Sequence, residues 1–155
     1  MPLDVKTLLL PEENDILLND VSEVSLKCIE KELEVNVPPG PPVYPVYGII
    51  RGPCCRMWIR LVLKKKQILM NAVFLYDTGS PYTHLSAETF EKLGYSNHIP
   101  ENSVVNVHGV NMNVYLSKNH FSHINLLGQD FSMCSRLKIM TSFEDFTFEF
   151  HRTIS

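Results

Sequence analysis

The stretch Asp77-Thr78-Gly79-Ser80 holds the residues of this chain that are best placed to do chemistry. It directly follows the apolar run from Ile68 to Tyr76, which predicts a buried strand that carries the Asp77 carboxylate onto a tight turn. Burying an ionised carboxylate costs on the order of several kcal/mol unless charges, hydrogen bonds or a shared proton offset that cost. One reaction that uses such a group is the hydrolysis of an amide by two aspartates that share a proton. One carboxylate activates a water and the other protonates or polarises the carbonyl.

This reaction needs two carboxylates, and the chain supplies only one of this kind. Neither Asp-Thr-Gly nor Asp-Ser-Gly occurs a second time in the 155 residues. A second copy would have to complete the active site across a two-fold axis, which predicts a homodimer. The tetrapeptide also fits ordinary turn chemistry, in which Asp77 accepts from its own backbone and Gly79 supplies a positive φ. The wholly apolar residues 72–76 before it favour the buried strand.

A second motif, Asn125-Leu126-Leu127-Gly128-Gln129-Asp130-Phe131, joins an apolar pair to a glycine. Together the two motifs resemble the pattern of the retropepsin-like aspartic peptidases, the single-lobed relatives of the pepsin family. The ordered pattern covers residues 43–150. In that family the second motif is a strand that passes beside the catalytic loop and helps to hold it. The resemblance therefore implies a loop-packing role for Leu126, Leu127 and Gly128.

The resemblance also implies a role for each residue around the first motif. Asp77 would be the catalytic aspartate, the Thr78 hydroxyl would hydrogen-bond across the dimer axis, and Gly79 would let the backbone approach the carboxylate and the substrate. Thr83 lies where the family often has a threonine and is a candidate for substrate binding. Ser80 stands where viral members commonly have alanine. A Ser80 hydroxyl that donates to the ionised carboxylate would lower the pKa of the pair, which predicts a more acidic activity profile than that of an alanine variant.

Residues 104–116 have the pattern of a β-hairpin with Gly109 available for its turn. By position this hairpin is a candidate for the flap that closes over substrate in such enzymes, which makes His108, Gly109 and Val110 candidates for substrate binding. An ordinary core hairpin fits the pattern equally well. Because a helix beginning after Ser86 uses part of this interval, we also expect that the flap could be short or missing.

The predicted fold is all-β with short helices: a closed, barrel-like lobe of the acid-protease type that acts as a homodimer. Strand-like runs cover residues 43–50, 57–63 and 68–76, and Ser86 and Gly94 are expected to cap a short helix. We divide the chain into an N-terminal accessory arm (1–37), a proline-rich linker (38–42) and the peptidase-like domain (43–155). In residues 21–37 the pattern fits a helix or a strand. The aromatic face of Phe146, Phe148 and Phe150 suggests a strand at the subunit interface.

Composition places the chain among small globular domains. Hydrophobic residues make up 45% and charged residues 20%, so a single core is expected. The net charge of −3 and the pI near 6.0 give no reason to expect nucleic-acid binding. The spacing of the four cysteines fits neither a zinc site nor a disulfide framework, and no cofactor or metal is expected. The sequence contains no export signal or transmembrane segment, which predicts a reducing, intracellular and cytoplasmic location.

Two functions of different classes follow from these residues. The first is an aspartic endopeptidase that cleaves polypeptides with a water held by two Asp77 carboxylates, one from each subunit. The second is a non-catalytic module of the same fold that forms dimers or binds peptides. Both predict a homodimer, and they differ in turnover.

Overall fold

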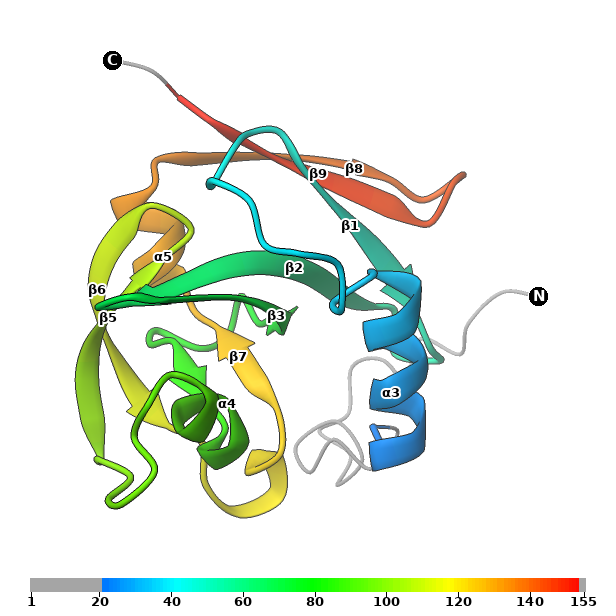
Figure 1. Cartoon of the computed structure of the whole chain (residues 1–155). Coiled ribbons are helices and arrows are strands. Elements are labelled where there is room, and N and C mark those ends of the chain that lie inside the picture. Colours follow the sequence, from blue (N-terminus) through cyan, green and yellow to red (C-terminus); the bar gives the residue numbers. More distant parts are fainter. Residues whose placement is uncertain (1–20, 154–155) are drawn as a thin grey trace.

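The structure is a computed structural model that describes residues 21–153. Its single mixed sheet has nine strands in the order β3-β7-β4-β6-β5-β2-β1-β9-β8, and a further pairing of β3 with β2 closes the first six into a barrel (Figure 1). The strands are β1 (Val46–Arg51), β2 (Arg56–Lys65), β3 (Ile68–Tyr76), β4 (His84–Leu85), β5 (Asn102–Val107), β6 (Val110–Leu116), β7 (Asn125–Leu127), β8 (Leu137–Ser142) and β9 (Thr147–Arg152). The helices are α3 (Glu23–Glu32), α4 (Ala87–Lys92), the 3₁₀ turn η1 (Asn119–Phe121) and α5 (Gln129–Cys134). The predictions of a mostly β fold, short helices and a closed barrel are confirmed.

The β2–β3 hairpin contributes the two longest strands of the barrel. Its register runs from Met57 opposite Tyr76 to Lys65 opposite Ile68, with the lysine-rich turn between the strands. Along β2 the buried and less buried residues largely alternate, as expected for a strand with one face on the core. The last six residues of β3 are all buried. This continuous run has a simple cause: one face of β3 meets the barrel interior and the other meets a second apolar cluster outside it.

That second cluster is formed with residues 21–37, the described part of the predicted arm. Ser22 and Ser25 form a reciprocal capping box that starts α3. The helix buries Ile29 against a set of residues on β2, β3 and β7 that comprises Trp58, Val73, Leu75 and Leu126. The helical alternative therefore holds over residues 23–32. Leu33, Val35 and Val37, whose alternation also fitted a strand, follow the helix and belong to no strand. The division into arm, linker and domain stays a prediction, but residues 21–37 pack on the barrel.

The terminal hairpin β8–β9 extends the sheet beyond the barrel through β1. Phe148 and Phe150 are 1% and 0% exposed and lie in the main core, with the Phe150 ring 5.2 Å from that of Tyr76. The prediction that this aromatic face forms a subunit interface was therefore wrong for both residues. The physical reason is that the inward faces of β1 and β9 pack on the barrel core of the same chain. Phe148 and Phe150 are therefore buried without a partner subunit. Phe146 instead lies exposed in the turn.

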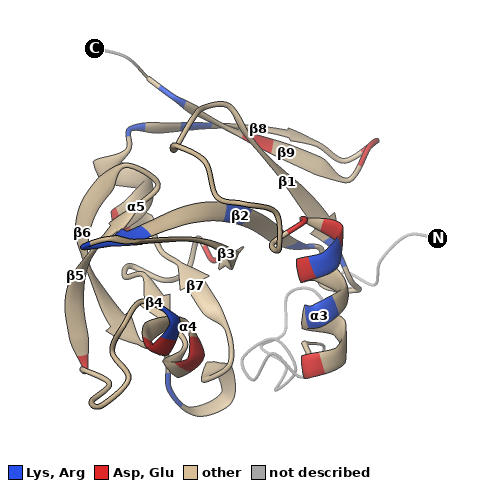
Figure 2. Cartoon of the chain, viewed as in Figure 1, with Lys and Arg blue, Asp and Glu red and all other residues tan. Residues whose placement is uncertain are grey.

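Two other predicted elements are confirmed, with the bounds given above. The Ser86 side chain accepts from the Thr89 amide at the start of α4, and Gly94 ends that helix with a φ of 101°. His108 and Gly109 form the β5–β6 turn, both at positive φ. Lys and Arg residues are spread over several elements (Figure 2). Among residues 21–153, no helix is long and apolar enough to cross a membrane.

The packing of α3 gives a stability prediction. We expect Ile29→Ala to lower the free energy of unfolding by about 2 kcal/mol, because the side chain is 8% exposed and fills the cluster against the barrel. Val24→Ala on the same helix, at a side chain 74% exposed, should change it by less than about 0.5 kcal/mol. Urea unfolding of both variants measures the difference, and equal effects would show that α3 does not stabilise the domain.

Candidate active site

Asp77 begins the loop that leaves β3, and its backbone continues the sheet for one more residue. The Asp77 amide donates to the carbonyl of Leu127 at 3.0 Å, which joins the loop to the end of β7. The Gly79 amide donates to Asp77 Oδ1 at 2.9 Å, and the Ser80 amide donates to the Asp77 carbonyl at 3.1 Å. These bonds fix the turn and use one carboxylate oxygen, and among residues 21–153 no group donates to the other oxygen, Oδ2.

The carboxylate itself is less buried than the strand before it. Asp77 is half-buried, while Thr78 and Gly79 are exposed. The expectation of a buried carboxylate is therefore not met within one chain, because the loop projects beyond the end of the sheet. Residues 21–153 therefore leave the Asp77 loop partly exposed.

Ser80 has a different role from the one predicted. Its hydroxyl donates to the carbonyl of Tyr82 at 2.7 Å and not to the Asp77 carboxylate. The predicted hydrogen bond from this hydroxyl to the Asp77 carboxylate was therefore wrong, and the more acidic activity profile expected from it loses its physical basis. Ser80 supports the loop through its backbone, since its carbonyl accepts from the Gln129 amide at 2.9 Å.

The second motif packs against the Asp77 loop and the end of β3, as the resemblance implied for Leu126, Leu127 and Gly128. Leu126 and Leu127 pair in parallel with the last residues of β3. Gly128 lies so close to the loop that an added Cβ would stand 2.3 Å from the Tyr82 carbonyl oxygen. Only glycine allows this approach of two backbones without displacement. The Gln129 side chain adds a bond of 3.3 Å to the Thr78 carbonyl.

Thr83 and Asp130 complete this support beneath the loop. The Thr83 side chain is 0% exposed, and its hydroxyl donates to Asp130 Oδ1 at 2.6 Å while accepting from the Gly128 amide at 3.1 Å. The Asp130 carboxylate also accepts from the Thr83 amide at 3.0 Å. Thr83 is thus a buried member of the scaffold, and the prediction that it contacts substrate does not fit its position.

Asp77 opens into a cavity of about 520 Å³, within the usual size range of ligand sites. The structure brings Asp77, Thr78, Gly79, Ser80 and Leu126 to its wall. The rest of the described lining comes from the β1–β2 turn, the ends of β2 and β3, the start of β4 and η1, and comprises Cys54, Cys55, Arg56, Met57, Leu75, Tyr76, Pro81, His84, His120 and Phe121.

His84 and Phe121 are wall residues that the sequence did not single out. The His84 and Phe121 rings are 5.4 Å apart in an edge contact. Burial lowers the pKa of His84, and the Tyr82 carbonyl with the carboxylates of Asp130 and Asp77 partly opposes that shift. Its Nδ1 is buried without a hydrogen-bond partner among residues 21–153. The only sequence signal was the position of His84 a few residues beyond the Asp77 turn.

The predicted flap residues lie elsewhere. The described lining of the Asp77 cavity does not include His108, Gly109 or Val110. His108 is 5% exposed and forms a bridge: its Nδ1 accepts from the Val62 amide at 3.2 Å and its Nε2 donates to the Val43 carbonyl at 2.9 Å. The β5–β6 hairpin is part of the barrel wall because β5 pairs with β2 and β6 pairs with β4. Of the two alternatives, the structure supports the core hairpin.

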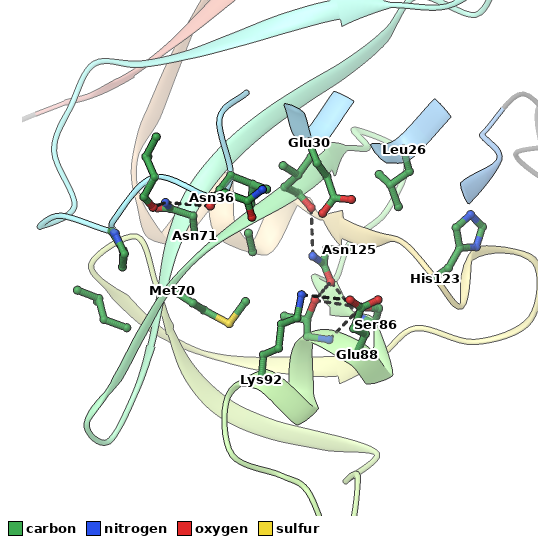
Figure 3. A pocket seen from close by; sticks show the side chains of 17 residues that line it. Leu26, Glu30, Asn36, Met70, Asn71, Ser86, Glu88, Lys92, His123 and Asn125 are labelled. Atoms are coloured by element: carbon green, nitrogen blue, oxygen red, sulfur yellow. Dashed lines mark hydrogen bonds and ion pairs between the residues drawn. The ribbon is translucent and has the colours of Figure 1, made fainter. Parts of the chain in front are cut away.

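A second cavity, of about 340 Å³, lies between α3 and α4 on the outer side of β3 (Figure 3). Its polar groups largely bind one another. Asn125 donates to the Val73 carbonyl and accepts from Ser86 and Thr89, and Lys92 forms an ion pair with Glu88. This pattern fits a structural seam that ties α4 to the sheet. Among residues 21–153, no cluster of three or more potential ligand side chains could hold a metal ion.

No protein-family model matches the chain, and no curated protein matches it significantly. Among solved structures, it is similar to a retropepsin-like aspartic protease from Rickettsia conorii, with 17% identity over 73% of this chain and 97% of that chain and a TM-score of 0.49. It is also similar to the retroviral protease-like domain of Ddi1 from Leishmania major, with 13% identity over 59% of this chain and 91% of that chain and a TM-score of 0.34. Both are of the class that the two sequence motifs resemble.

The scaffold beneath the loop can be tested through Thr83. We expect Thr83→Val to lower the free energy of unfolding by about 1–3 kcal/mol, because it leaves the buried Gly128 amide without a partner and removes the hydroxyl bond to Asp130. The matched change Thr141→Val, at an exposed residue of β8 away from the loop, should alter stability by less than about 0.5 kcal/mol. Denaturant unfolding compares the two, and a harmless Thr83→Val would contradict the assigned role.

The bridge made by His108 predicts a pH dependence of stability. Burial lowers the pKa of His108 below its unfolded value of about 6.5, and the bond to the Val43 carbonyl partly opposes this shift. A proton on Nδ1 would also break the bond from the Val62 amide. The unfolded chain then binds more protons, so stability is full above the unfolded pKa and falls as pH drops towards the folded pKa. Unfolding measured from about pH 7.5 to 5 should show a smaller loss in His108→Asn than in the wild type. The exposed His98→Asn should keep the wild-type slope.

Proposed function

We propose that this chain is one subunit of a homodimeric aspartic endopeptidase in which the two copies of Asp77 hold a single water. The observation that carries the proposal is the Asp77 carboxylate on an exposed loop whose backbone is tied on two sides. The Gly79 amide donates to Asp77 Oδ1, and the Asp77 amide donates to the Leu127 carbonyl at the end of β7. A fixed carboxylate at the edge of a cavity is the arrangement that acid-base chemistry requires.

The exposure of the loop supports a site shared by two copies. An exposed Thr78 and Gly79 leave room for the same loop of a second chain, related by a two-fold axis. Two carboxylates brought within hydrogen-bond distance of one water cannot both ionise readily, so the pair would carry one shared proton. The second copy would then supply the desolvation that a single chain lacks.

Peptide hydrolysis follows from such a pair. The ionised Asp77 of one subunit takes a proton from the water, and the water oxygen attacks the peptide carbonyl carbon. The protonated Asp77 of the other subunit donates its proton to the carbonyl oxygen. The Asp77 that took the proton of the water then gives it to the nitrogen, and the C–N bond breaks. One hydroxyl of the tetrahedral carbon returns its proton to the other Asp77, which restores the pair. The scheme forms no covalent bond to the protein. The Gly79 amide holds Oδ1 throughout and leaves Oδ2 to face the water.

The wall of the cavity fits an extended polypeptide better than a small polar molecule. Leu75, Phe121 and Leu126 give it apolar surface, and Met57 adds a flexible side chain. The exposed backbone of Thr78 and Gly79 offers donors and acceptors to a substrate main chain. The substrate class we propose is therefore a polypeptide.

A second candidate is a non-catalytic module that dimerises or binds peptides through the same surface. The position of His108 favours it, because the hairpin expected as a flap belongs to the barrel wall. Without a closing hairpin, water exclusion around the reacting groups is weaker. This candidate keeps binding and loses turnover.

In the proposed mechanism, peptide cleavage depends completely on the Asp77 carboxylate. Asp77→Asn should abolish cleavage of a mixed peptide library at every pH from acid to neutral, because an amide can neither take up the proton of the water nor share one. Asp145→Asn, in the β8–β9 turn and outside the lining of the cavity, should keep the activity. Mass spectrometry of the peptides gives the readout.

The same assay separates the two candidates. Cleavage that persists in Asp77→Asn would exclude the proposed mechanism. Binding of library peptides without cleavage by the wild type would favour the non-catalytic module.

A further inference from the structure

The segment Pro38-Pro39-Gly40-Pro41-Pro42 lies between α3 and β1 and has no part in the proposed site (Figure 1). Proline fixes its own φ, and a residue that precedes a proline is held in an extended conformation. Residues 38–43 accordingly contain no helix, strand, turn or bend. An extended chain of this composition has the conformational preference of a polyproline II helix. We call residues 38–42 the proline arch.

Both ends of the proline arch are fixed to the barrel. At one end the Val37 carbonyl accepts from the side chain of Asn71 on β3 at 2.8 Å. At the other end the Val43 carbonyl accepts from His108 Nε2 in the β5–β6 turn at 2.9 Å. Asn71 and His108 are both buried. The arch is therefore held at a defined place on the protein.

Between these anchors the arch is bare. Among residues 21–153, no hydrogen bond involves any residue of the arch. Four of its five residues are exposed, and Pro39 is half-buried. A Cβ added to Gly40 would meet no atom within 4 Å. The backbone carbonyls of the arch are therefore open to donors from another molecule.

A stiff spacer is the ordinary alternative for a proline-rich segment. A spacer of that kind keeps two units apart. Here α3, which precedes the arch, packs on the same barrel that carries both anchors. Spacing therefore does not account for the exposed prolines.

The exposed prolines also have a regular arrangement. A polyproline II helix has about three residues per turn, so Pro38 and Pro41 fall on one edge of the arch. Both are exposed, and both line a cavity of about 470 Å³ whose wall also includes Val62 of β2. This cavity gives room for the side chains of a partner beside that edge. The exposed Glu34 lines the same cavity and adds a negative charge to it.

We propose that the proline arch is a docking site for a partner protein whose groove is lined with aromatic side chains and has a basic rim, of the kind that SH3 and WW domains form. Proline rings pack between the aromatic rings of such a groove, and the bare carbonyls accept from its Trp N–H and Tyr O–H groups. The basic rim complements Glu34. Because the arch is already held at both ends, binding requires little further ordering of the chain.

Tyr44, the next aromatic residue, takes no part in this docking. Its hydroxyl is buried, and its ring centroid is 5.1 Å from that of His108. The inference is also independent of the proposed peptidase function, because no residue of the arch belongs to the described lining of the Asp77 cavity.

Titration of the full chain into a panel of purified, isotope-labelled SH3 and WW domains tests the inference, with NMR shifts of the groove residues as the readout. Pro38→Ala/Pro41→Ala removes the exposed edge of the arch. Pro53→Ala, at an exposed proline of the β1–β2 turn, is the matched control, and Tyr44→Phe tests the excluded residue. Urea unfolding checks that each variant is folded. Ultracentrifugation of the chain alone measures self-association.

We expect at least one domain to bind the wild type through its aromatic groove, and Pro38→Ala/Pro41→Ala to weaken that binding about tenfold or more, because two rings that enter the groove are lost. Pro53→Ala and Tyr44→Phe should bind like the wild type, and a peptide of residues 37–43 should compete. Binding by none of the domains, or equal binding by Pro38→Ala/Pro41→Ala, would overturn the inference. Binding of the peptide but not of the full chain would show that the fold does not present the arch. Self-association that is lost in Pro38→Ala/Pro41→Ala would assign the arch to a second copy, which also contradicts the inference.

Discussion

The close approach of Gly128 to the Tyr82 carbonyl is the constraint on which the site depends. Because these two backbones touch, the strand that ends at Leu127 can accept the Asp77 amide, and the residues after Gly128 can reach the loop. Thr83 then closes the arrangement from inside the barrel by bonding both Gly128 and Asp130. The catalytic candidate is thus exposed at its tip and rigid at its base, a combination that suits a group that must meet a partner in a fixed geometry.

The rest of the fold keeps this base in place. Within the closed barrel, β3 pairs with β2 along one edge and with β7 along the other, and its inner face packs on the barrel core. On the other side α3 covers the outer face of β3, so the strand that carries Asp77 is buried on both faces. The terminal hairpin also contacts the end of β3, because the Phe150 ring of β9 packs edge-on against the Tyr76 ring. Three strands that are distant in sequence, β2, β7 and β9, therefore meet at Tyr76, the residue immediately before Asp77.

Local sequence signals were enough for several elements and failed where tertiary partners decide. The β2–β3 hairpin, the cap of α4 at Ser86 and the β5–β6 turn at Gly109 depend on short-range patterns, and each was predictable. The direction of the Ser80 hydroxyl depends on where the Tyr82 carbonyl lies, and the burial of Phe148 depends on how β1 and β9 curve over the barrel. The wall residues His84 and Phe121 come from separate elements that only the fold brings together. For the same reason, the cavity position of Cys54 and Cys55 needed the sheet register.

The central claim is that two copies of Asp77 act as one site, and mixed dimers test it most directly. Wild-type and Asp77→Asn chains are unfolded together in varying ratios, refolded, and assayed for peptide cleavage at constant total protein. If each active site needs a carboxylate from both subunits, activity will follow the square of the wild-type fraction. Activity that falls in direct proportion to that fraction would show that one chain is sufficient and would contradict the account.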